Sequence, residues 1–545
     1  MTMTTAWCPD RRLLLRMGAL GLGALSIPGA AQVMLGARGF THGVASGEPG
    51  PTSVLLWTRY VGSGSETALT VELAETTSFS HIISGGQVTA QASRDHIVKH
   101  VAQGLEPGRW YYYRFIAPDG ATSCIGRTRT LPVGSVSQFN LGVFSCANMG
   151  FGWFNAYADA AGRGDIDLAV HVGDYLYEYQ AGGYPDAAHT VVGRDFLPTS
   201  EAIHLADYRL RYASYRGDAA LQRLHQVVPW IAMWDDHELA NDAWQGGAQN
   251  HTPAREGEWA LRKAAALQAY REWMPVADSD YRSYEIGDLA TIALPETRIT
   301  GRMKQFEIGD VTRGQADTAA ALAAFRDGPW QAADRSLLGP TQERWLNGLI
   351  AGSVAAGKKW QIIAQQVIMG RVNVTPDIGT WVADDAPDYV KRRSATAAAA
   401  ARAGLPLNMD AWDGYPAARA RLLGAAQSAG ANIVTLSGDT HNGWAFNLTH
   451  DSRPAGVEFA GHSVTSAGFE AYVPRAPSVV ETMLRTANPG LRWVDASRRG
   501  YMAVALTPAR VTSTWRMWDD VRTAQTPMTS EASQSALHGT NRLSG

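Results

Sequence analysis

Cysteine is scarce in this sequence, and neither sign of charge dominates it. The 545 residues include three cysteines, too few for a disulfide-stabilised scaffold or a thiolate-rich zinc module. Lysine and arginine number 48 against 51 aspartates and glutamates, and the formal net charge is −3. No overall basic field therefore attracts nucleic acid or an anionic membrane surface.

Two common catalytic motifs are also missing. A serine hydrolase needs Gly-x-Ser-x-Gly between a strand and a helix, and the nearest match, Gly461 to Thr465, lacks the final glycine. No P-loop pattern is present, which argues against an enzyme driven by nucleotide hydrolysis. The length of the chain instead predicts two or more folding units.

The first 31 residues are predicted to be an export signal rather than part of the fold. Asp10 to Arg16 resembles a twin-arginine signal, an uncharged run follows from Met17 to Leu35, and small residues suit a signal peptidase near Ala31. An uncleaved membrane anchor is the alternative, but the glycines and Pro28 make a poor spanning helix. We therefore expect the twin-arginine export machinery as a partner, no stable membrane anchor, and a periplasmic or extracellular protein.

Residues 40–132 are predicted to form a small β-sandwich. Short β-type runs between turn residues include Ser53 to Thr58 and Trp110 to Phe115. A turn that leads into an aromatic strand is common in immunoglobulin-like sandwiches. We interpret the aromatic residues here as core and edge packing.

After Pro132 strands alternate with helices, which is typical of a layered α/β unit. The expected strands cover residues 139–144, 168–172, 227–234, 360–365 and 433–436, and the expected helices cover 208–224, 259–273, 341–349 and 417–427. We place this unit at residues 138–520 and expect a C-terminal tail over residues 521–545.

Four of these strands end in side chains that can bind metal ions. The four segments are Phe144-Ser145-Cys146-Ala147-Asn148, His171 to Glu178, Trp234-Asp235-Asp236-His237-Glu238 and Leu436 to Asn442. Ligands bind beyond the carboxyl ends of the strands in α/β sheets, so we expect these side chains to converge. Carboxylate and amide oxygens suit Ca²⁺, Mg²⁺ or Mn²⁺, whereas thiolate and phenolate ligands suit iron.

Each segment also has a purely structural interpretation. Cys146 could be a buried apolar thiol or the disulfide partner of Cys124. Asp235-Asp236 could cap a helix, and Gly438-Asp439 could be a tight turn. Together, however, Gly-Asp-x-x-Tyr, Asp-His-Glu and Gly-x-x-His after successive strands have the order of a binuclear metallophosphoesterase.

On these motifs the sequence resembles the PhoD-like alkaline phosphatases, relatives of the purple acid phosphatases. The resemblance runs along nearly the whole mature chain. It also rests on Phe40 to Pro49, Leu55 to Arg59, Tyr208-Arg209 to Tyr215-Arg216, Asp413 to Pro416 and Arg499-Gly500-Tyr501. The fold that it implies is a four-layer αββα metallophosphoesterase sandwich, preceded by a small immunoglobulin- or fibronectin-like β-sandwich.

The resemblance further implies a site for Fe³⁺ and Ca²⁺, with Mg²⁺ or Mn²⁺ as alternatives. Cys146, Asp174 and Tyr177 match the ligands of the ferric ion, with Asp174 bridging. The positions expected to complete the iron and calcium shell are Asp236, Asn241, Asp439 and His441. His237 is expected to face the phosphate and to protonate the leaving oxygen.

Two positions depart from the pattern of the wider superfamily. Its usual Asp-x-His on the first strand is Ser145-Cys146 here, as the PhoD-like family expects, and Gln365-Gln366 stands where others place a further histidine. A site poor in histidine favours hard oxygen ligands over zinc. His462 matches no motif, and we expect it to be structural.

These expectations amount to an exported metal-dependent phosphatase or phosphodiesterase that hydrolyses a phosphate ester by attack of metal-bound hydroxide on phosphorus. A phospholipase D-like phosphodiesterase of the same family is one alternative. The alternative from another class is a non-catalytic secreted binding protein, which predicts acidic residues that do not converge. We expect a monomer, because no interface pattern stands out.

Overall fold

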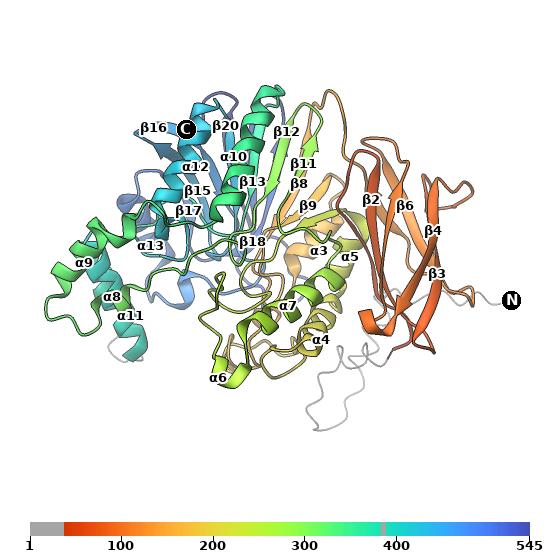
Figure 1. The fold of residues 1–545 in the computed structure, drawn as a ribbon, viewed down its shortest axis with the longest axis horizontal. Coiled ribbons are helices and arrows are strands. Elements are labelled where there is room, and N and C mark those ends of the chain that lie inside the picture. The colour runs from red at the N-terminus through yellow and green to blue at the C-terminus, as the bar shows by residue number, and fades with distance from the viewer. Residues whose placement is uncertain (1–36, 383–387, 545) are drawn as a thin grey trace.

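The computed structural model describes residues 37–382 and 388–544 (Figure 1). The predicted export signal, residues 1–31, lies outside the described residues. Within the described part of the chain, no helix is both long and apolar enough to cross a membrane.

The larger of two big sheets has nine strands and runs through the whole molecule. In spatial order these are β20 (Ser530–Leu537), β19 (Arg510–Trp518), β18 (Arg499–Leu506), β8 (Phe139–Phe144), β9 (Leu168–His171), β10 (Trp230–Ala232), β1 (Gly39–Gly47), β2 (Ser53–Val61) and β5 (Ile97–Gln103). Strands β8, β9 and β10 are parallel, so their carboxyl ends meet at one edge. Strand β20 pairs along its length with β19. The expectation of a tail over residues 521–545 is therefore wrong, because this segment closes the sheet.

The second big sheet has seven strands. In spatial order these are β11 (Arg282–Ile286), β12 (Ala290–Leu294), β13 (Trp360–Ala364), β14 (Ile433–Ser437), β16 (Arg453–Ala460), β15 (Gly443–His450) and β17 (Leu491–Asp495). In β13, Ile362 belongs to the core shared with the nine-stranded sheet, whereas Ile363 belongs to a core formed with helices. Both faces of this sheet are thus buried, as its continuous apolar strands require.

Helices cover the outer faces of the two sheets (Figure 1). Those against the seven-stranded sheet are α10 (Gly339–Ala355), α12 (Pro416–Ser428) and α13 (Pro477–Ala487). Those that pack into the core of the nine-stranded sheet are α3 (Asn155–Gly162), α4 (Leu205–Arg216), α5 (Ala219–Val227) and α7 (Trp259–Trp273), and α6 (Pro253–Glu256) precedes α7. Helices α8 (Ile308–Thr312), α9 (Thr318–Asp327) and α11 (Asp388–Arg402) project at the left of the view around a small core of their own.

The predicted helix over residues 208–224 is two helices in the structure. Helix α4 ends at Arg216 and α5 begins at Ala219. The break follows from Asp218, whose carboxylate accepts hydrogen bonds from the N–H groups of Ala220 and Leu221 and so caps a new helix. The hydrophobic period alone did not reveal this cap.

The N-terminal strands enclose a separate core at the right of Figure 1. Opposite β1, β2 and β5 lies a four-stranded sheet in the order β4 (Ser84–Gln91), β3 (Glu66–Ala74), β6 (Trp110–Ile116) and β7 (Gly126–Arg129). Tyr111, Tyr113 and Phe115 of β6 point into this core, because alternate residues of a strand share a face. The two strands expected here are confirmed as β2 and β6.

We expected the N-terminal module and the large unit to be separate, but in the structure they share a sheet. Strand β1 pairs in parallel with β10 where Gly47 lies opposite Trp230. Neighbouring residues of β1 face different cores, with Val44 in the N-terminal core and Ala45 in the large one. One sheet of the module is thus an extension of the nine-stranded sheet.

The close packing at this junction leads us to predict that Gly47 cannot be replaced by a residue with a side chain without loss of stability. A Cβ at this residue would lie 2.0 Å from the carbonyl oxygen of Pro275, so Gly47→Ala must displace backbone. We expect the free energy of unfolding to fall by about 1–3 kcal/mol, the usual effect of overpacking, as measured by chemical denaturation. In the matched control Gly64→Ala the nearest atom is 3.7 Å away, and stability should hold. Equal stability of the two variants would contradict this account of the junction.

Candidate metal centre

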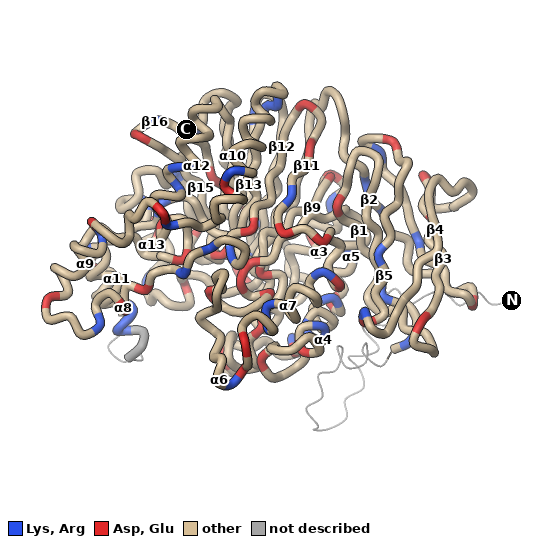
Figure 2. Tube along the Cα trace, viewed as in Figure 1, with Lys and Arg blue, Asp and Glu red and all other residues tan. Residues whose placement is uncertain are grey.

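The four strand ends singled out in the sequence converge between the two big sheets. Three overlapping groups of potential ligands lie there, each with ligand atoms within 4.8 Å of one another. They are Cys146 with Asp174 and His441, Asp174 with Asp236 and His237, and Asp235 with Asp236 and Asp439. In Figure 2 several acidic positions lie in the middle of the molecule, with basic positions among them. A scattered arrangement, as the binding-protein alternative predicted, is not what the structure has.

The backbone at the strand ends is unusual. Cys146, Asp174, Asp439 and His441 all have positive φ, between 55° and 64°. Residues with a side chain adopt this left-handed region infrequently, and it is enriched at functional sites. Gly438 lets two of the strand ends touch, since a Cβ there would lie 2.6 Å from the Cβ of Ser145. The turns therefore bring side chains from both sheets into one small volume.

In the first ligand group the potential ligand atoms face one another. The hydroxyl of Tyr177 donates to Asp174 Oδ2 (2.9 Å) and lies 3.3 Å from Nε2 of His441. Nδ1 of His441 donates to the carbonyl oxygen of Ala467 (2.6 Å), so the lone pair of the neutral ring is on Nε2 and faces the other potential ligands. Burial lowers the pKa of His441 to about 3, which keeps the ring neutral.

These residues fit a metal ion on their own contacts. Asp174 Oδ1 is a buried acceptor without a hydrogen-bond partner among the described residues, and such an atom is costly unless something binds it. Burial raises the pKa of Cys146, Asp174 and Tyr177 well above their usual values. A cation reverses that balance, because it stabilises thiolate, carboxylate and phenolate. No disulfide joins Cys146 to Cys124, the other partner considered for it.

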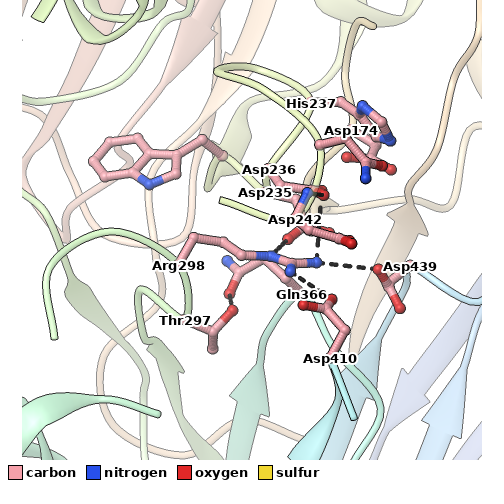
Figure 3. A network of polar contacts seen from close by, with 12 residues as sticks. Asp174, Asp235, Asp236, His237, Asp242, Thr297, Arg298, Gln366, Asp410 and Asp439 are labelled. Atoms are coloured by element: carbon pink, nitrogen blue, oxygen red, sulfur yellow. Dashed lines mark hydrogen bonds and ion pairs between the residues drawn. The ribbon is translucent and has the colours of Figure 1, made fainter. Parts of the chain in front are cut away.

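The third ligand group, Asp235 with Asp236 and Asp439, surrounds a buried arginine that the sequence analysis missed. Arg298 is fully buried, and Figure 3 shows its guanidinium pointing into the middle of the carboxylates. It pairs with Asp235, with Asp410 at 2.6 Å, with Asp439 at 3.1 Å and with Asp236 at 3.5 Å. Arg298 follows β12 by four residues, so the strand-end argument used for the other segments could have found it. Asp410 lies in a loop and carries no comparable signal.

The carboxylates around Arg298 are of two kinds, one with a lowered pKa and the others with a raised pKa. Burial would raise the pKa of Asp236, but the charges of Arg298 and His237 outweigh it and lower the pKa to about 2. Burial raises the pKa of Asp235 to about 8 and of Asp439 to about 7, even beside Arg298. Asp242 is also raised to about 8 by burial and by its acidic neighbours. The group therefore carries more acid than its arginine can neutralise, which suits a further cation.

His237 belongs to the second ligand group, with Asp174 and Asp236, and its ring is held by Glu178. Nδ1 of His237 is 2.8 Å from the fully buried Glu178 Oε2, which leaves Nε2 free. Burial would lower the pKa of His237, but the charges of Asp236, Asp174 and Glu178 raise it well above its usual value. These charges favour the protonated ring, which is the form that a general acid requires. Glu178 was part of a sequence motif, but its positioning role was not foreseen.

The other predicted residues lie as follows. Asn241 makes its hydrogen bonds outside the three ligand groups: its side-chain amide donates to Gln249 (3.1 Å), and its backbone N–H donates to Glu178 (2.8 Å). Its role as a metal ligand stays a prediction. Gln366 accepts a hydrogen bond from Thr297 (2.5 Å), and Figure 3 shows this pair beside Arg298. His462 is buried against Asp495 at 3.2 Å, in keeping with a structural histidine.

Glu238 ties two of the strand ends together. Its carboxylate accepts hydrogen bonds from the N–H groups of Tyr175 (2.6 Å), Asp235 (2.8 Å) and Asp174 (3.1 Å). These donors belong to the turns that follow β9 and β10. A single buried side chain thus fixes the spacing of Asp174 and Asp235.

Glu238→Gln is expected to destabilise the protein, because an amide nitrogen cannot accept and one buried N–H group loses its partner. The free energy of unfolding should fall by about 1–3 kcal/mol in denaturant titrations. Glu75→Gln removes a carboxylate from a half-exposed pair with Arg109 and should change stability by less than about 0.5 kcal/mol. If both variants are as stable as the parent, Glu238 does not hold the turns.

Comparisons with known proteins find relatives along nearly the whole chain. The family described as PhoD-like phosphatase matches residues 141–515, and the PhoD-like phosphatase N-terminal domain matches residues 28–132. Alkaline phosphatase D of Bacillus subtilis (strain 168) is 33% identical over 506 residues, which cover 88% of this chain and 77% of that protein. The solved structure titled "Structure of PhoD" aligns with a TM-score of 0.75 and 29% identity, over 93% of this chain and 92% of that one.

Proposed function

Because this chain belongs to the PhoD-like phosphatase family, and is therefore a hydrolase of phosphoric esters, we propose that its active site is the metal centre at the converging strand ends. The observation that carries the proposal is the overlap of the three ligand groups, in which Asp174 and Asp236 each belong to two. Shared carboxylates of this kind suit two cations held side by side.

The residues divide between the two cations by their donor atoms. Cys146, Asp174, Tyr177 and His441 would hold Fe³⁺, since thiolate and phenolate suit that ion. Asp236 and Asp439, with Asn241 as the expected amide ligand, would hold Ca²⁺, or Mg²⁺ or Mn²⁺ in its place. When bound, the cations would polarise the phosphoryl oxygens and lower the pKa of a water molecule.

The protein's own residues supply the remaining steps. Glu178 orients the ring of His237 through Nδ1, so that Nε2 can give its proton to the departing alkoxide oxygen. Glu238 keeps the two acidic turns at a fixed separation. Arg298 holds Asp235, Asp410 and Asp439 in place and moderates their repulsion.

Further parts of the proposal rest on sequence and layering. We assign residues 1–31 to a twin-arginine signal that directs a monomeric enzyme to the periplasm or the exterior. Residues 40–132 are assigned to a fibronectin-like module, and the large unit, from residue 138, to a four-layer αββα sandwich. The order of helices and sheets supports the latter assignment. Monoesters, diesters and phospholipid headgroups all suit the centre. Comparing the rates of hydrolysis of mono- and bis-nitrophenyl phosphate distinguishes a phosphatase from a phospholipase D-like diesterase.

Asp174→Asn tests the assignment of the centre. Loss of the shared carboxylate should lower kcat/KM on nitrophenyl phosphate by at least about 10²-fold, more than the loss of an outer-shell residue. Elemental analysis of the same preparation should show reduced iron. Asp119→Asn, in an exposed turn, is the matched control and should keep both activity and metal. Full activity of Asp174→Asn would place the reaction elsewhere.

His237→Gln tests the role of the histidine as a proton donor. An alkyl phosphate leaves as a strongly basic alkoxide, so its hydrolysis should slow by about 10²-fold or more. Nitrophenyl phosphate leaves as a stable phenolate and should be affected far less. Equal losses on the two substrates would show that His237 does not protonate the leaving group.

A further inference from the structure

Arg216, the last residue of α4, is a buried cation that the metal centre does not use. Its side chain is fully buried, and none of its three guanidinium nitrogens has a hydrogen-bond partner among the described residues. Arg298 and Arg302 beside the metal centre pair with carboxylates, but no ion pair of Arg216 exists within residues 37–382 and 388–544. An uncompensated buried charge of this kind is strongly destabilising.

The surroundings of Arg216 come from both parts of the molecule. Its guanidinium lies over the ring of Trp57 in β2, 4.1 Å from the ring centroid. The hydroxyls of Ser46 in β1 and Tyr113 in β6 face one another in the same region, and within the described residues neither has a partner at hydrogen-bonding distance. On the other side lies Tyr175, from the turn after β9, whose hydroxyl is 2.9 Å from Nε2 of His225.

None of these neighbours can neutralise the guanidinium. Burial raises the pKa of Tyr175 to about 12, and it raises the pKa of Tyr113 further, so both phenols are uncharged at neutral pH. The ring of Trp57 offers a cation–π contact, which offsets part of the lost hydration but carries no charge. Guanidinium N–H groups only donate hydrogen bonds, and the neighbouring hydroxyls can accept them but carry no charge, so the cluster lacks an anion.

We propose that Arg216, Ser46 and Tyr113 bind a small monovalent anion of the chloride class at the junction of the N-terminal module with the large unit. A water molecule could satisfy some of the donors, but only an anion also balances the charge of Arg216. All three side chains are fully buried, so a monatomic anion fits between them better than a phosphate ester. Its binding joins β1 and β6 to the end of α4 and is independent of the proposed function.

Bromide locates the site directly, because it replaces chloride and scatters anomalously. Crystals of the full chain grown with sodium bromide should show an anomalous peak within hydrogen-bond distance of the guanidinium of Arg216 and the hydroxyl of Tyr113. Density for water at that position, without an anomalous peak, would overturn the proposal.

Thermal unfolding gives the second measurement. At equal ionic strength, chloride should raise Tm by about 2 °C or more over gluconate, which is too large to enter. Arg216→Met should abolish this shift, whereas Arg194→Met, which removes a buried arginine already paired with Asp218 at 2.6 Å, should keep it. An unchanged shift in Arg216→Met would show a general salt effect and refute the site. Should Arg216→Met fail to fold, Tyr113→Phe provides the same comparison, with a reduced shift expected.

Discussion

The active centre depends on holding many carboxylates together against their own repulsion. Arg298 contacts four of them while fully buried, and one guanidinium cannot balance that number of acids. Burial accordingly keeps the pKa of Asp235 and Asp439 high when only protein charges are present. Bound cations would supply the missing positive charge. The same excess of acid that destabilises this arrangement on its own would therefore create affinity for metal ions.

The scaffold meets this demand at strand ends that belong to different sheets. Positive φ values at Cys146, Asp174 and Asp439 turn the side chains back toward one another, and Glu238 satisfies the N–H groups that the turns leave unpaired. Strained turns persist only where their surroundings fix them. Here the surroundings are two sheets whose inner faces share one core. The packing of this core holds the turns of the centre in place.

The sequence alone predicted which strand-end side chains converge, because parallel strands have their carboxyl ends at one edge of the sheet. Cys146, Asp174, Asp236 and His441 were found in this way and lie together in the structure. Asp410 could not be found, since a loop residue reaches the site only through the path of the folded chain. The strand β20 was missed for a similar reason: the partner of an edge strand is not encoded locally.

The N-terminal module shows how the site is linked to distant parts of the chain. Strands β1 and β2 bury both faces, with Leu56 in the module's own core and Leu55 in the large one. Removing the module would therefore expose the core that supports β9 and β10. Tyr175 adjoins the shared ligand Asp174 in sequence, and its hydroxyl reaches His225 on α5, a helix that packs against β1 and β7. The module thus forms a wall of the unit that holds the metal-binding turns, so we expect its stability and the geometry of the centre to change together.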